Sequence, residues 1–212
     1  MATSALEMGQ HVVLSVGALD QLCRALASDG YTLCGPRARD GAIVLDQISG
    51  VADLPRGLGD EQAPGHYRLR ARGDDALFGY AVAAHSPKRE LLVPRTTLFT
   101  IRKRGQALEV ETPPAPEHKL ALIGVRACEL AAIATQDRVL TQGPYVDSDY
   151  GARRRQLFTL AVNCGAPAGT CFCVSMQTGP QARAGFDLAA TELLAPSHRF
   201  VVEVGTDRGA EL

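Results

Sequence analysis

The chain has 212 residues, of which 46% are hydrophobic, and its 22 basic and 23 acidic residues leave a formal net charge of −1. This length fits one large domain or two small ones, and the apolar content excludes a disordered chain. The balanced charge and the 5% aromatic content exclude the basic, aromatic-rich surfaces typical of nucleic-acid binding. No apolar run approaches the roughly 18 residues of a membrane span, and the first ten residues lack a signal-peptide pattern, so we expect a cytoplasmic protein.

The first half of the chain predicts a helix followed by hairpins. Apolar residues recur every three or four positions over 12–28, and Ser15 is a suitable N-cap, which would make 12–14 a lead-in strand or turn. The other elements expected here are strands at 31–36 and 42–48 around the turn Asp40-Gly41, a loop over 50–65, strands at 66–72 and 76–83, and a hairpin of 98–103 with 107–111.

Residues 112–117 contain three prolines and mark the best internal boundary. This boundary would separate an N-terminal region of residues 1–112 from a C-terminal region of residues 113–212. The alternative is one continuous domain. Beyond the boundary the pattern predicts a buried strand at 119–125, a helix at 129–139 and a second buried strand at 157–162, which together form a βαβ unit. A helix at 185–194 and a strand at 199–204 complete an α/β fold with a mixed sheet.

Four of the six cysteines fall at informative positions. Cys128 and Cys164 each follow a buried strand of the βαβ unit, and Cys171 and Cys173 lie in the loop after Cys164. Since parallel strands end at the same edge of a sheet, we expect the four thiols to meet there. Cys23 and Cys34 instead fall on apolar faces and are expected to be small buried residues.

Three interpretations of four converging thiols remain open from the spacing. The gaps of six residues and one residue between the last three cysteines are poor for a zinc knuckle, whereas an iron–sulfur cluster accepts ligands scattered along the chain. The third interpretation is a reactive thiol pair, or thiols that are merely buried.

Around these cysteines the chain resembles one family. The segments that carry the resemblance are Ile123-Gly124-Val125-Arg126-Ala127-Cys128-Glu129-Leu130, Val162-Asn163-Cys164, Gly169-Thr170-Cys171-Phe172-Cys173-Val174-Ser175-Met176 and Thr178-Gly179-Pro180. They are similar to the beta (iron–sulfur) subunits of cytosolic sulfhydrogenase-type nickel–iron hydrogenases and to the corresponding subunits of anaerobic sulfite reductases.

The resemblance implies a non-catalytic electron-relay subunit with one 4Fe–4S cluster on Cys128, Cys164, Cys171 and Cys173. Its implied partners are a flavin-containing reductase subunit that meets NAD(P)H and a catalytic hydrogenase or sulfite reductase subunit. The ferredoxin-like domain of the family, with its Cys-x2-Cys-x2-Cys-x3-Cys-Pro motif, is absent from this sequence. The alternatives are a zinc-stabilised scaffold subunit and a thiol redox protein that uses the Cys171–Cys173 pair.

Four further residues are candidates for binding the cofactor. Arg126 would favour a reduced cluster by its charge, or form a surface ion pair with Glu129. Asn163 would hydrogen-bond a sulfur or end its strand, and Gly165 would let backbone amides approach the sulfurs. Phe172 would shield the cluster from water or pack in the core.

Overall fold

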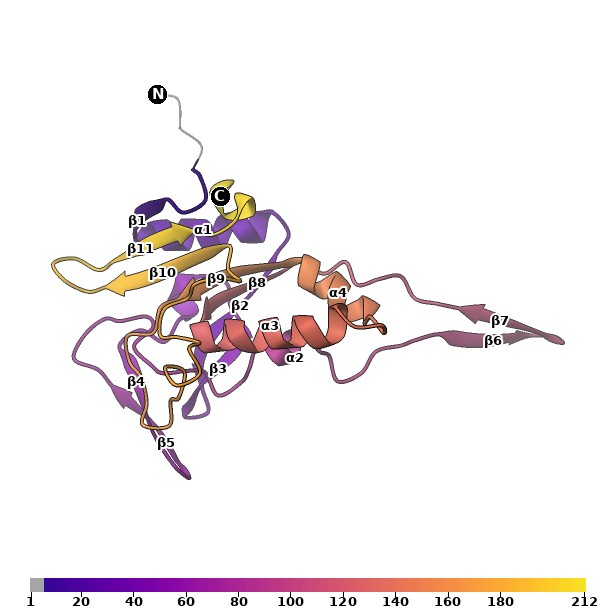
Figure 1. Ribbon diagram of the computed structural model, residues 1–212, viewed down its shortest axis with the longest axis horizontal. Helices are drawn as coiled ribbons and strands as arrows, with labels where there is room; N and C mark the ends of the chain where they lie inside the picture. Colours follow the sequence, from indigo (N-terminus) through magenta and orange to yellow (C-terminus); the bar gives the residue numbers. More distant parts are fainter. Residues whose placement is uncertain (1–5) are drawn as a thin grey trace.

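The computed structural model describes residues 6–212. Residues 1–5 lie outside the described residues. They are half of the first ten residues, in which we expect no signal peptide. Seven strands form one mixed sheet (Figure 1), in the order β1 (His11–Ser15), β11 (Arg199–Val204), β10 (Leu188–Leu193), β9 (Leu157–Val162), β8 (Leu120–Val125), β2 (Thr32–Arg39) and β3 (Ala42–Gln47). Neighbours among β2, β8, β9 and β10 pair in parallel, and the outer pairs are antiparallel. The chain therefore has the expected α/β fold.

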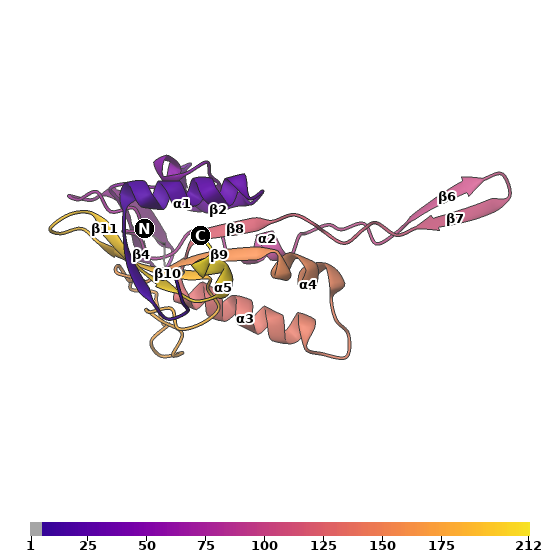
Figure 2. The ribbon, with the colours of Figure 1, turned by 90° about the horizontal axis from the view of Figure 1, so that it is seen from above.

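Helices cover both faces of this sheet. Figure 2 shows α1 (Val16–Ser28) on one side and α3 (Ala127–Thr141) on the other. Each face has its own apolar core, because alternate residues of a strand point to opposite sides. The shorter helices are α2 (Lys88–Leu91), α4 (Ser148–Arg155), α5 (Asp207–Ala210) and the 3-10 turn η1 (Val51–Asp53).

The βαβ unit is present as β8, α3 and β9. Every residue of β8 and β9 is buried, as expected for central strands covered on both faces. The sequence boundary at residue 112 does not separate two sheets, because β2 and β8, from either side of it, pair in parallel. The expected start of the first helix is also confirmed: Ser15 accepts a hydrogen bond from the Ala18 N–H, and β1 precedes it.

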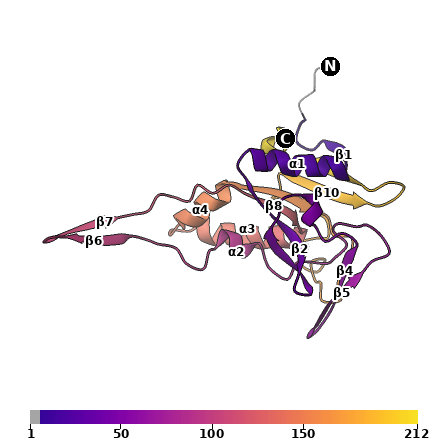
Figure 3. The same cartoon turned by 180° about the vertical axis from the view of Figure 1, so that it is seen from behind.

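Two hairpins stand apart from the main sheet. β4 (Leu58–Ala63) pairs with β5 (His66–Ala71), and β6 (Thr100–Arg104) pairs with β7 (Ala107–Glu111). Figure 3 shows them at different ends of the molecule, with β6 and β7 forming a long arm that projects away from the body. The arm matches the hairpin expected over 98–111, whereas β4 replaces part of the expected loop over 50–65.

Two other expectations were wrong. Residues 185–194 form no helix; they contain β10, which pairs with β9 on one side and β11 on the other. These two ladders outweigh the helical preference of an alanine-rich segment. Residues 76–83 form no strand, yet Leu77, Phe78 and Tyr80 are buried in the core.

Candidate functional site

The carboxyl ends of β8, β9 and β10 form the edge of the sheet where the cysteines were expected. β8 ends in a bulge at Gly124, whose φ of 83° would be strained for any other residue, and α3 begins two residues after the strand. Cys128 therefore lies in the first turn of α3, and Cys164 lies two residues beyond the end of β9. Both cysteines flank this edge, as the topology predicted.

Cys173 packs beside the start of α3. A Cβ built on Gly179 would lie 3.3 Å from the Cys173 sulfur and 3.4 Å from the Ala127 Cβ, so Gly179 leaves room for Cys173 at the helix. The next residue, Pro180, accepts a hydrogen bond from the Cys164 N–H at 3.1 Å. The burial of Cys128, together with the charges of Glu129 and Cys173, raises the pKa of its thiol. These contacts place Cys173 beside the start of α3, where Cys128 lies, and tie Cys164 to the same loop through Pro180.

Cys171 is the outermost of the four. It is exposed, and its sulfur accepts a hydrogen bond from the Ala168 N–H at 3.3 Å within its own loop. Among residues 6–212, no three His, Cys, Asp or Glu side chains are arranged to hold a single metal ion. In this structure, therefore, the four sulfurs do not surround one point.

The cysteines fall into two classes of environment. Cys23 and Cys34 are buried, and burial raises the pKa of their thiols to about 11 and about 12. The other four cysteines are exposed or half-buried, so reagents and metal ions can reach them. This confirms the expectation that Cys23 and Cys34 are small buried residues.

Arg126 is a buried clamp rather than a surface residue. It is 1% exposed, and its guanidinium lies over the Tyr80 ring at 4.8 Å. It donates to the carbonyl oxygens of five residues, which are Ala81 at 3.1 Å, Phe78 at 2.8 Å, Tyr80 at 2.7 Å, Val162 at 3.4 Å and Asn163 at 3.3 Å. It does not form the surface ion pair considered from the sequence; instead, Glu129 accepts a hydrogen bond from its backbone N–H. Arg126 therefore joins segment 78–81 to the end of β9.

Asn163, Gly165 and Phe172 have different environments. The Asn163 side chain donates to Thr191 and accepts from the Ala182 N–H, both at 2.8 Å, so it fastens the cysteine-bearing loop to β10. Gly165 faces open space. Phe172 is 70% exposed, so in this structure it neither shields the cysteines nor packs in the core.

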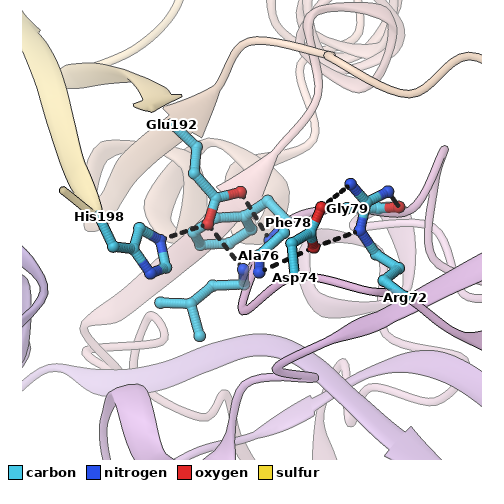
Figure 4. Close-up of polar contacts among 8 residues, drawn as sticks. Arg72, Asp74, Ala76, Phe78, Gly79, Glu192 and His198 are labelled. Carbon is cyan, nitrogen blue, oxygen red and sulfur yellow. Dashed lines mark hydrogen bonds and ion pairs between the residues drawn. The ribbon is translucent and has the colours of Figure 1, made fainter. Parts of the chain in front are cut away.

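A cavity of about 230 Å³ lies next to Cys164, and sequence reasoning missed most of its wall. Glu192 of β10 accepts hydrogen bonds from the N–H groups of Leu77 and Phe78, at 2.6 and 3.0 Å, and contacts His198 Nε2 at 2.8 Å (Figure 4). No sequence signal marked Glu192, because it falls in the segment expected to be a helix.

Arg72 completes the opposite wall of this cavity. Its guanidinium donates to both carboxylate oxygens of Asp74, at 2.7 and 2.6 Å, and to the Gly79 carbonyl at 3.0 Å (Figure 4). Bidentate pairing of this kind is rigid as well as strong. Segment 76–81, bound by Arg72, Arg126 and Glu192, is therefore a fixed wall beside Cys164.

No helix among residues 6–212 combines the length and the apolar content needed to cross a membrane. Comparisons with protein-family models, curated proteins and solved structures gave no match.

Proposed function

We propose that this chain is an electron-transfer subunit, or a portion of one, that holds a single 4Fe–4S cluster on Cys128, Cys164, Cys171 and Cys173. The observation that carries the proposal is the division of the six cysteines. The two with no proposed role are buried, and the four proposed ligands are exposed or half-buried. Cys173 packs against Gly179 beside the start of α3, and the Cys164 N–H donates to the carbonyl of the next residue, Pro180.

The residues around the thiols fit a cluster better than a single ion. A tetrahedral zinc site needs sulfurs within about 4 Å of one another, given Zn–S bonds of about 2.3 Å. A cluster is held at its corners and accepts ligands scattered along the chain, as the spacing of these four cysteines in the sequence requires. The exposed bend that carries Cys171 then closes onto the other three ligands when the cofactor binds, because metal binding and local folding are coupled.

The cluster would supply reversible one-electron storage, and the chain would set how readily it is reduced. The buried guanidinium of Arg126 stands two residues before Cys128, and its contacts are neutral carbonyl groups. Its positive charge is therefore not cancelled by a direct ion pair and favours the more negative, reduced form of the cluster. The exposed side chains of Phe172, Val174 and Met176 lie between and just after Cys171 and Cys173 and offer an apolar surface to an electron-transfer partner.

The resemblance noted from the sequence supplies the finer features of the proposal. It implies a role in a cytoplasmic hydrogenase or sulfite reductase complex. There it passes electrons from a flavin-containing reductase subunit to a catalytic metal subunit, or in the reverse direction.

Anaerobic reconstitution with iron and sulfide tests the proposal. We expect about four iron and four sulfide per chain, together with a paramagnetic signal after reduction. Replacing any one of the four ligands by serine lowers the iron content, and the matched controls Cys23→Ala and Cys34→Ala keep it. Stoichiometric zinc without bound iron would favour the scaffold alternative. Disulfide exchange that depends on Cys171 would favour the thiol redox alternative. Equal iron retention in the ligand and control variants would refute the cluster site.

A further inference from the structure

The β6–β7 arm is an isolated two-stranded ladder that projects from the body (Figures 1 and 2). The described side-chain contact nearest its base is the hydrogen bond from the Thr96 hydroxyl to Asp149 of α4, at 3.0 Å. A lone two-stranded hairpin is only marginally stable in water, so its own interactions are a weak reason for such an extended shape.

The two faces of the arm differ in chemistry. The register pairs Ile101 with Val110 and Lys103 with Leu108, and residues paired across a ladder share a face. This face therefore carries three large apolar side chains, which are 55% (Ile101), 69% (Leu108) and 65% (Val110) exposed. Surface apolar residues that form one continuous strip, unlike scattered ones, are typical of an interaction site.

On the opposite face, basic and acidic side chains form ion pairs with one another. Arg102 pairs with Glu111 at 3.3 Å, and Arg104 pairs with Glu109 at 3.1 Å. Lys103, on the apolar face, has no ion-pair partner among residues 6–212. A partner surface that complements this face is therefore apolar and offers a negative charge to Lys103.

The area of the arm favours a different subunit over a second copy of this chain. Two arms stacked face to face would each cover about 17 Å by 10 Å, or roughly 170 Å², whereas a stable interface buries about 800 Å² per partner. A groove that wraps the apolar face and both strand edges buries more of the arm than this flat contact and leaves the charged face in solvent. The two hollows described in residues 6–212 are not apolar grooves of this kind, since charged side chains line both, such as Arg183 and Asp187 in one and Arg72 and Glu192 in the other.

We propose that the β6–β7 arm docks into an apolar groove of a different protein subunit, and that a carboxylate of this partner contacts Lys103. The partner is thus a protein whose groove has an acidic rim. The proposal does not depend on the cluster, because the arm carries none of the four cysteines.

Two adjacent residues of β7 provide a matched pair of variants. Leu108→Asp places a charge on the apolar face opposite Lys103, and Ala107→Asp places the same charge on the other face opposite Arg104. Both new carboxylates gain a basic cross-strand neighbour, so both variants keep the hairpin. They differ in the face that they alter.

The test uses the full tagged chain, purified with its complex from its own organism and treated with a carbodiimide, which joins a lysine amine to a carboxylate in contact with it. Peptide mass spectrometry should find Lys103 joined to an Asp or Glu of a different polypeptide. Leu108→Asp should lose this product and weaken retention of that polypeptide about tenfold, while Ala107→Asp changes retention less than about twofold.

Four results would each overturn the proposal. The first is that Lys103 joins no other polypeptide, and the second is that it joins a second copy in a mixture of isotope-labelled and unlabelled chains. The third is that Leu108→Asp leaves retention unchanged. The fourth is that the arm binds vesicles of phosphatidylglycerol and phosphatidylcholine in a manner lost in Leu108→Asp. The iron content of both variants is measured in parallel, so a failed arm and a failed cluster are told apart.

Discussion

Replacing Arg126 by methionine should remove more stability than any surface substitution in this protein. Methionine keeps much of the buried volume but leaves three well-formed hydrogen bonds unmade, to the carbonyls of Ala81, Phe78 and Tyr80. Each buried acceptor left without a donor costs about 1–3 kcal/mol, and removing the buried charge returns some of that cost. We therefore expect a loss of about 3 kcal/mol in the free energy of unfolding, a large share of the roughly 5–15 kcal/mol typical of a domain.

The assay is equilibrium unfolding in urea, with Arg24→Met as the control. The Arg24 side chain is 76% exposed in its ion pair with Asp20, so its loss should cost under about 1 kcal/mol. Hydrogen exchange should also quicken in segment 76–81 of Arg126→Met, because the clamp on that segment is lost. An unfolding free energy within about 0.5 kcal/mol of wild type would refute the role assigned to Arg126.

Three further predictions follow from the site. In metal-free protein at mildly alkaline pH, iodoacetamide should modify the four proposed ligands and spare Cys23 and Cys34. A raised pKa keeps the thiols of Cys23 and Cys34 protonated, and burial shields them from the reagent. Mass spectrometry counts the adducts. Modification of Cys23 or Cys34 as fast as the four proposed ligands would contradict the reasoning. Gly179→Ala should lower iron incorporation, since its Cβ would crowd a proposed ligand sulfur at 3.3 Å, whereas Gly165→Ala, with open space around it, should not. Glu192→Ala should lower the free energy of unfolding, measured by heat or urea, by about 2–4 kcal/mol, because two buried N–H groups lose their acceptor. An unchanged free energy of unfolding would count against this role of Glu192.

Local patterns predicted much of the fold. The periodicity and N-cap of the first helix, the Asp40-Gly41 turn and the two continuous apolar strands are all present as expected. The expected meeting of four cysteines at one sheet edge stays a prediction: Cys173 packs against Gly179 and Cys164 bonds to Pro180 in the same loop, while Cys171 lies on an exposed bend. The identity of the cofactor stays a prediction.

The failures share one cause, which is that distant partners override local preference. Segment 76–81 is as apolar as a strand, but its backbone groups are satisfied by the side chains of Asp60, Arg126 and Glu192 instead of a neighbouring strand. These side chains come from 21 to 115 positions away in the chain, so no local pattern announces them.

By itself, then, the sequence determined which segments are apolar enough to be buried and where the cysteines lie relative to the strands. Only the tertiary structure decided that residues 188–193 join the sheet, that Arg126 is buried among carbonyls, and that the 98–111 hairpin stands alone with an exposed apolar face. Periodicity is a property of neighbouring residues, whereas strand partners, hydrogen-bond acceptors and solvent exposure depend on groups that meet only when the chain is folded.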